Sequence, residues 1–344
     1  MKMHVHPYRL LMRGTFTTAH GAVTHRDNLR VELSHEGHIG LGEVTAISYY
    51  HIEPAQLAQT FRQVRPMIEQ MELLQPERFY HSLYAALRYQ PFALSAIDMA
   101  AWDLFGKLHG QRSLDYLQLD ERKAPLSSLT ISLQSPASAL DFIDDNPWPI
   151  YKIKLGGPDD LKLMQTIRRH TNSVLRVDAN SGWNVEETIE KSQVLQELGV
   201  EFIEQPLPAH QKAGYAGLQE RCALPLIADE SCHVPGDVSW CAEHFAGINI
   251  KLMKCGGITP ALMMIKEARR LGIKVMIGCM TETSIGISAA AQLLPLVDYA
   301  DIDGSLLITN DNAEGVKLSS GHVIYPSNPG NGVTLRLSTP PRTE

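Results

Sequence analysis

The stretch YKIKLGG, residues 151–157, places two lysines two positions apart within a short apolar run. In a β-strand, side chains two positions apart share a face, so Lys152 and Lys154 point the same way. The other side chains of the run, all apolar, then point to the opposite face. An ordinary half-buried strand turns its apolar face to the core. This stretch inverts that pattern, and it predicts an interior that holds two ammonium groups side by side.

The same rhythm of a short apolar strand, a polar end and an amphipathic helix recurs along the last two thirds of the chain. The predicted strands are SLTISLQ, YKIKLGG, LRVDANS, VEFIEQPL, PLIADES, GINIKLMK, KVMIGCM and YADIDGSLL. Successive steps between Lys152, Asp178, Glu204, Asp229, Lys251, Gly278 and Asp303 are 26, 26, 25, 22, 27 and 25 residues. A period near 25 with alternating strands and helices favours a (β/α) barrel over an open sheet.

The first third of the chain has a different pattern. Residues 29–33 and 39–44 are typical of a β-hairpin, and a helical period follows, with one apolar stripe in SAIDMAAWDLFGKLHG. We therefore predict an α+β segment over residues 1–122 and a barrel over residues 123–320. The Pro/Gly-rich residues 321–344 are predicted to fold back onto the first segment.

The composition is that of a globular protein, with 344 residues, 44% hydrophobic and 20% charged. A formal charge of −7 argues against binding to nucleic acid or to an anionic membrane. Five cysteines without CxxC spacing favour neither a disulfide framework nor a zinc knuckle. No stretch resembles a signal peptide or a membrane span, so we expect a cytoplasmic protein with a small-molecule partner. The sequence leaves a homo-oligomer open.

Three consecutive predicted strands end in a carboxylate, namely Asp178, Glu204 and Asp229. On adjacent strands these side chains would converge on one wall, and three like charges so close are costly unless a cation lies between them. Ligation by oxygen alone suits Mg²⁺. Asn180 and Glu230 are predicted to support the ligands from the second shell. Three independent helix caps or salt bridges are the alternative.

Lysines flank the carboxylates. Lys152 and Lys154 end the second predicted strand and Lys251 ends the sixth, which lies across a barrel from it. This arrangement suits removal of a proton next to a carboxylate, because the cation stabilises the dianionic enolate. A lysine base needs its pKa lowered from ~10.4 towards neutrality, and a neighbouring ammonium and a divalent cation both act in that direction.

The last predicted strand contributes DIDG, in which Asp301 and Asp303 share a face. Two more carboxylates beside a cation site suggest a second positive partner, such as an ammonium group on the substrate. A helix cap plus one salt bridge is the alternative.

These motifs resemble the enolase superfamily, specifically its muconate-lactonising-enzyme-like subgroup. The matching stretches are KIK, VDAN, EQP, ADES and IKLMKCGG, with GLGEV and SAIDMAAWDLFGKLHG in the first segment. The resemblance implies an α+β capping domain over a modified (β/α)7β TIM-like barrel of the α/β class. It also implies one Mg²⁺ per subunit on Asp178, Glu204 and Asp229, and it implies that Lys154 and Lys251 form the acid/base pair.

Within this subgroup the dipeptide epimerases hold the substrate's N-terminal ammonium with an Asp-x-Asp on the eighth strand. DIDG and the preceding GCMTETSIGI are similar to that arrangement. The resemblance therefore implies a dipeptide epimerase that inverts an α-carbon by two-lysine 1,1-proton transfer through a metal-stabilised enolate. Lys152, Asp301, Asp303 and Thr281 are the implied substrate-binding residues.

The substrate side chain is predicted from one position at which this chain differs from similar epimerases. Epimerases acting on Ala-Glu resemble this chain in FTTAHG, but they carry an arginine about where Gly21 falls. Gly21 argues against an acidic second residue, with Arg26 and His20 as candidates to replace the arginine. We expect a neutral or hydrophobic second residue.

The enzyme rivals are o-succinylbenzoate synthase and a muconate-type cycloisomerase, which share the metal ligands and the lysine pair. Neither substrate carries an ammonium for Asp301 and Asp303, and N-acylamino acid racemisation is disfavoured for the same reason. A sugar-acid dehydratase would want a His/Asp dyad around strands six and seven, where KVMIGCM has no histidine. An inactive metal-binding barrel is the non-enzyme alternative. Such a barrel should have lost a lysine or a ligand, and none is missing.

Overall fold

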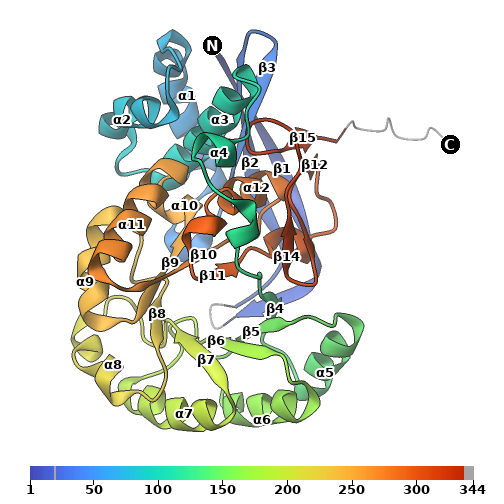
Figure 1. The fold of residues 1–344 in the computed structure, drawn as a ribbon, viewed down its shortest axis with the longest axis vertical. Coiled ribbons are helices and arrows are strands. Elements are labelled where there is room, and N and C mark those ends of the chain that lie inside the picture. The colour runs from blue at the N-terminus through green and yellow to red at the C-terminus, as the bar shows by residue number, and fades with distance from the viewer. Residues whose placement is uncertain (19–20, 337–344) are drawn as a thin grey trace, which may run out of the picture.

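The protein combines an antiparallel three-stranded sheet and an eight-stranded parallel sheet closed into a barrel (Figure 1). The computed structural model describes residues 1–18 and 21–336. Helices surround the parallel sheet, and a separate group of helices packs on the antiparallel one. The predicted fold class, a barrel with an α+β capping domain, is confirmed.

The capping part begins with three strands in the order β1-β2-β3. Its elements are β1 (Lys2–Thr18), β2 (Gly21–His35), β3 (His38–Thr45), α1 (Pro54–Gln70), α2 (Pro76–Leu87), α3 (Pro91–Leu108) and α4 (Ser113–Tyr116). The predicted hairpin is the β2–β3 pair. Helix α3 lies directly on β3, because a Cβ added at Gly42 would fall 1.9 Å from the carbonyl oxygen of Ala96. Glycine at this position therefore lets the two backbones touch.

The barrel contains all eight predicted strands. They are β4 (Leu129–Ile131), β5 (Ile150–Lys154), β6 (Val174–Asp178), β7 (Val200–Glu204), β8 (Leu226–Ala228), β9 (Gly247–Lys251), β10 (Lys274–Gly278) and β11 (Tyr299–Asp301). Each strand pairs in parallel with its neighbours in chain order. The ring closes where Ser128 N donates a 3.1 Å hydrogen bond to Ala300 O.

Helices cover the outside of the barrel (Figure 1). The α-helices are α5 (Pro136–Asp145), α6 (Asp160–His170), α7 (Val185–Glu197), α8 (Leu218–Arg221), α9 (Val238–His244), α10 (Leu252–Cys255), α11 (Ile258–Leu271) and α12 (Ser284–Ala291). The 3₁₀ helices are η1 (Ser48–Tyr50), η2 (Glu121–Lys123), η3 (Lys212–Tyr215), η4 (Pro235–Asp237), η5 (Leu294–Leu296) and η6 (Gly304–Leu307).

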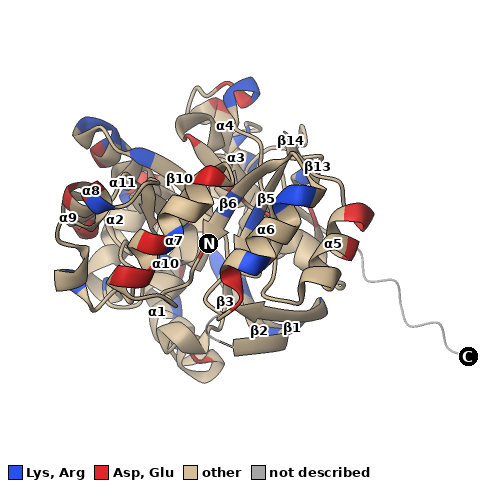
Figure 2. Ribbon diagram, turned by 90° about the horizontal axis from the view of Figure 1, so that it is seen from below, with Lys and Arg blue, Asp and Glu red and all other residues tan. Residues whose placement is uncertain are grey.

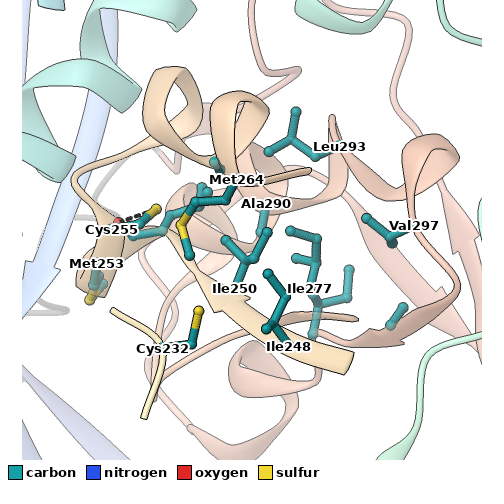
Figure 3. Packing of buried hydrophobic residues seen from close by; sticks show 14 of the residues in the cluster. Cys232, Ile248, Ile250, Met253, Cys255, Met264, Ile277, Ala290, Leu293 and Val297 are labelled. Carbon is teal, nitrogen blue, oxygen red and sulfur yellow. Dashed lines mark hydrogen bonds between the residues drawn. The ribbon is translucent and has the colours of Figure 1, made fainter. Parts of the chain in front are cut away.

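The outward residues of the strands form the core between sheet and helices. Figure 3 shows Ile248 and Ile250 of β9 in one apolar cluster with Ile277 of β10 and Met264 of α11. Because side chains alternate along a strand, the residues between and after these isoleucines, Asn249 and Lys251, face the barrel interior. The apolar cover thus explains how a strand can present polar side chains inward.

The residues after the barrel form β12 (Ala313–Glu314), β13 (Lys317–Ser319), β14 (His322–Ile324) and β15 (Thr334–Leu335). They contact the capping part, since Ser113 N donates to Gly330 O at 2.7 Å and Asn331 N donates to Asp103 at 2.8 Å. The division at residues 122 and 320 stays a prediction. Acidic and basic residues are interspersed over the ribbon in Figure 2. Among the described helices, none has the length and apolarity needed to cross a bilayer.

Candidate active site

The polar residues at the strand ends come together inside the barrel. Lys154, Asp178, Glu204 and Lys251 are the last residues of β5, β6, β7 and β9, and Asp229 directly follows β8. All five side chains are buried. The predicted ligands and lysines therefore share one site at the carboxyl ends of the strands, where barrels place their active sites.

Asp178, Glu204 and Asp229 form a cluster that fits a metal ion. Each offers one carboxylate oxygen, and these oxygens lie within 4.8 Å of one another. The three residues are fully buried. Three buried carboxylates supply the hard oxygen donors that Mg²⁺ prefers. The donor set therefore fits the predicted Mg²⁺ site.

The three carboxylates of this cluster have different pKa values. Burial and the nearby Asp178 raise the pKa of Glu204 to about 8. Burial also tends to raise the pKa of Asp178 and of Asp229. Nearby lysines have the larger, opposite effect, so the pKa of each lies below its ordinary value. The uneven protonation follows from three carboxylates facing one another in a desolvated space.

The two proposed acid/base lysines each pair with a different member of the cluster. Lys154 Nζ donates to Asp178 Oδ2 at 2.7 Å, and Lys251 Nζ donates to Asp229 Oδ2 at 2.6 Å. Three strands, β6 to β8, lie between the strands that carry them. The lysines thus flank the carboxylates from two sides, as the sequence predicts.

Lys152 lies deeper than its predicted role as a substrate-binding residue suggests. Its side chain is 1% exposed, and Nζ lies 2.7 Å from both Glu204 Oε2 and Asp301 Oδ2 and 3.1 Å from Asp178 Oδ2. Burial lowers its pKa, but these carboxylates raise it to a value well above the ordinary one. Lys251 behaves in the same way, with Asp229 as the main cause of the increase.

The expectation that a neighbouring ammonium lowers the pKa of the base lysine is wrong in its net direction at Lys251. Among the protein's own groups, the carboxylates outweigh the ammonium groups, and the net direction at Lys152 and Lys251 is upward. Any lowering depends on a bound divalent cation, which would offset the carboxylate charge.

The two aspartates of DIDG have different partners. A substrate ammonium was expected as the positive partner of both, but Asp301 already has a protein cation: its Oδ2 accepts a 2.7 Å bond from Lys152, and its Oδ1 accepts a 2.6 Å bond from Ser128 Oγ. Asp303 accepts a 2.6 Å bond from Thr130 N and has no ion pair within residues 1–18 and 21–336. Burial and Asp301 raise the pKa of Asp303 to about 6. Asp303 is therefore the carboxylate that matches the expected ammonium site.

The expected supporting residues lie beside the cluster. The backbone N–H of Asn180 donates to Asp178 Oδ1 at 2.9 Å, and its Nδ2 donates to Glu230 Oε1 at 3.4 Å. Asn180 and Glu230 also line the cavity next to the lysines.

Two further residues were not singled out from the sequence. Lys254 is buried and donates to Asp229 Oδ1 and, at 2.5 Å, to Asp229 O. Asn249 Nδ2 donates to Glu204 Oε1 at 2.8 Å. Asn249 lies two positions before Lys251 on β9, so strand alternation could have found it. Lys254 lies in the quoted IKLMKCGG, but beyond the strand, where alternation gives no direction.

A cavity of about 130 Å³ adjoins these residues and lies between barrel and cap. The barrel contributes Lys152, Lys154, Lys251, Asp301, Asp303 and Thr281, and the cap contributes Phe16, Arg26, Ile47, Tyr49 and Tyr50. Arg26 is half-buried and makes no ion pair within the described ranges, and burial lowers its pKa. Gly21 begins β2 and does not line the cavity, while His20 lies outside the described residues.

Comparisons with known proteins agree with this geometry. Residues 3–117 match the family model "Mandelate racemase / muconate lactonizing enzyme, N-terminal domain", and residues 135–339 match "Enolase C-terminal domain-like". The chain is 42% identical to an L-Ala-D/L-amino acid epimerase of Flavobacterium johnsoniae over 97% of this chain and 100% of the relative. It is 34% identical to a hydrophobic dipeptide epimerase of Roseobacter litoralis over 97% and 99%.

A solved structure shows the same fold. The dipeptide epimerase of Cytophaga hutchinsonii, in complex with Mg and D-Ala-L-Val, superimposes with a TM-score of 0.92 at 25% identity. The match covers 98% of this chain and 96% of that one. Similarity in sequence and in fold thus extends over both the cap and the barrel.

Proposed function

The chain belongs to the mandelate racemase/muconate lactonizing enzyme family of the enolase superfamily, and from this premise we propose that it is a Mg²⁺-dependent dipeptide epimerase. The observation that carries the proposal is the combination of two buried lysines around a three-carboxylate cluster with a carboxylate, Asp303, that has no cationic partner in the described chain. The proposal includes a cytoplasmic location and a dipeptide as the small-molecule partner.

The three carboxylates would hold one Mg²⁺. When bound, Mg²⁺ would supply positive charge that makes loss of the proton next to the peptide's carboxylate less costly. Asp178, Glu204 and Asp229 are the residues in position to hold it, with Asn180, Glu230, Asn249 and Lys254 around them. The support from these neighbours is the ordinary device for fixing ligand orientation.

Lys154 and Lys251 move the proton. The neutral amine of one lysine takes the α-proton, and the electron pair stays on the substrate as an enolate. The ammonium group of the other lysine then gives a proton to the opposite face of the same carbon. Their placement on β5 and β9, on two sides of the carboxylates, supports this division of labour. For the opposite epimer the two roles reverse.

Asp303 binds the N-terminal ammonium of the dipeptide. An ammonium placed there would relieve the cost of a buried carboxylate that has no cationic partner among the described residues. Lys152 lines the cavity and also keeps Asp301 charged and in place. A muconate-type or succinylbenzoate-type substrate would leave Asp303 without a cation, and this disfavours the rival activities.

The second residue of the dipeptide is neutral or hydrophobic in this proposal, because Gly21 provides no guanidinium and the cap side of the cavity contains Phe16, Ile47 and Tyr50. Arg26 is the observation that favours the alternative of an acidic side chain, since it lines the cavity and has no ion pair in the described chain. Replacing Arg26 by Gln separates the two. If Arg26 binds an acidic side chain, the Gln variant should lose activity on acidic dipeptides and keep it on neutral ones.

The experiment is mass spectrometry of a pooled dipeptide library incubated with enzyme and Mg²⁺ in D₂O. A gain of one mass unit on a subset of dipeptides is expected, because each proton returned to the α-carbon comes from solvent. The Lys154→Ala/Lys251→Ala double variant is the control and should give no exchange. Absence of exchange in every dipeptide, together with turnover of a succinylbenzoate or muconate substrate, would overturn the proposal. Absence of all turnover would favour the inactive barrel.

A further inference from the structure

Glu43 is a fully buried carboxylate of the cap, and it binds a helix of the barrel. It lies on β3, within the GLGEV stretch. Its Oε1 accepts hydrogen bonds from Thr283 N at 3.0 Å, Thr283 Oγ1 at 2.8 Å and Gly286 N at 2.6 Å. These donors belong to the N-cap and first turn of α12, whose free N–H groups need acceptors. A side chain of the capping domain therefore supplies the acceptor for the free N–H groups at the start of a barrel helix.

The second oxygen of Glu43 is held by the cap itself. Oε2 accepts a 2.5 Å bond from Tyr8 Oη and a 2.8 Å bond from Asn28 Nδ2. Asn28 Nδ2 also donates to Thr45 Oγ1 at 3.2 Å, and Thr45 Oγ1 donates to the carbonyl oxygen of Thr281 at 2.7 Å. Two buried residues of β3, Glu43 and Thr45, thus form hydrogen bonds with the barrel segment between β10 and α12 at two points.

That segment lines the substrate cavity. Cys279, Met280 and Thr281 line the cavity together with the cap residues Ile47 and Tyr50. Ile47 follows Thr45 by two positions. The end of β3 therefore binds the loop at residues 279–281 and leads directly into the cap wall at Ile47.

The backbone is closely packed on both sides of Glu43. A Cβ added at Gly286 would fall 2.0 Å from Glu282 Oε2 and 3.0 Å from Glu43 Oε1. Behind β3, the added Cβ of Gly42 would meet the α3 backbone, as described above. Glu43 thus lies between a glycine of α12 and a strand that touches α3. A change in its hydrogen bonds should therefore move α12 and the preceding residues 279–281.

We propose that Glu43 is a positioning residue for peptide binding. It acts through Thr283 and α12, and through Asn28 and Thr45, to set the cavity-lining residues 279–281. It touches neither the lysines nor the carboxylate cluster. The inference rests on the proposed function, and it concerns the binding of the dipeptide rather than the proton transfer.

The test is steady-state kinetics of Glu43→Gln and Thr45→Val on one accepted dipeptide. Gln keeps the size of the side chain but loses the charge that binds three donors, and Val keeps the shape of threonine but loses the bond to Thr281. We expect each variant to raise KM about tenfold and to change kcat less than about threefold. The double variant should raise KM by less than the product of the single effects, because both act on one segment.

Asp103→Asn is the matched control. Asp103 is also a buried cap carboxylate, and it binds β3 through Leu41 N and the C-terminal segment through Asn331 N, away from the cavity loop. Asp103→Asn should lower the melting temperature as Glu43→Gln does, but it should leave KM unchanged.

The possible failures are distinguishable. An unchanged KM in Glu43→Gln with an active wild type would overturn this inference alone, as would an equal rise of KM in Asp103→Asn. A wild type without exchange on any dipeptide would refute the proposed function and this inference with it.

Discussion

Asp303→Asn removes one charge from the substrate cavity and keeps the shape of the side chain. Asp303 is 2% exposed, and its one hydrogen bond to the described backbone comes from Thr130 N at 2.6 Å. The carbonyl oxygen of an asparagine can accept the same bond. Thr130 N therefore keeps its partner, and the change isolates the interaction of the carboxylate with a substrate ammonium.

The expected size of the effect follows from the burial of this carboxylate. A hydrogen bond to a charged group contributes about 1.5–3 kcal/mol, which is about a 10- to 100-fold change in binding. We expect KM for a dipeptide to rise by that factor and kcat to change little, because Lys154 and Lys251 bond to Asp178 and Asp229 and not to Asp303. Asp301→Asn should differ and lower kcat as well, because it takes a partner from Lys152.

The assay compares a dipeptide that has a free amino terminus with its N-acetylated form. The wild type should prefer the free amine strongly, and Asp303→Asn should lose most of that preference. Because burial and Asp301 raise the pKa of Asp303 to about 6, the carboxylate becomes charged as the pH rises through that value. KM of the wild type should therefore fall between about pH 5 and pH 7, and that change should vanish in the variant. Equal loss of activity on both peptides would refute the ammonium site.

Three further changes test the surroundings. Lys254→Met leaves Asp229 with one lysine fewer in a buried site, and it should lower the free energy of unfolding in urea by about 3 kcal/mol; a loss below about 1 kcal/mol would contradict the buried pair. Asp229→Asn should weaken Mg²⁺ binding at least about tenfold by calorimetry, and an unchanged affinity would exclude it as a ligand. Burial raises the pKa of Asp98 to about 7 from an ordinary 3.8, so the folded chain binds the extra proton, and stability should fall as the pH rises from about 4 to 7. Asp98→Asn should flatten that slope, whereas an unchanged slope would assign it to another group.

The positions of the ligands and lysines could be predicted because the barrel repeats one local rule. Each strand ends at the same rim, and alternation decides which side chains face inward. Lys152, Lys154 and Asp178 follow from that rule alone, and so could Asn249. Helix α3 follows from the apolar stripe in SAIDMAAWDLFGKLHG in the same way.

The partners inside the site could not be predicted locally. Lys152 meets Asp301 because the barrel closes and brings together residues 149 positions apart. Lys254 reaches Asp229 from a short helix after β9, where no strand rule applies. Arg26 reaches the cavity because the cap sheet packs over the barrel mouth. Each of these contacts depends on closure or packing between distant segments, which a local pattern does not contain.

The central claim is that Lys154 and Lys251 serve opposite faces of one α-carbon. The most direct test is proton NMR of Lys154→Gln and Lys251→Gln in D₂O with Mg²⁺, each given the two epimers of an accepted dipeptide separately. We expect neither variant to epimerise, and we expect each to exchange the α-proton of one epimer only, with the two variants showing opposite preferences. Exchange of the same epimer by both variants, or epimerisation by either, would contradict the two-lysine account.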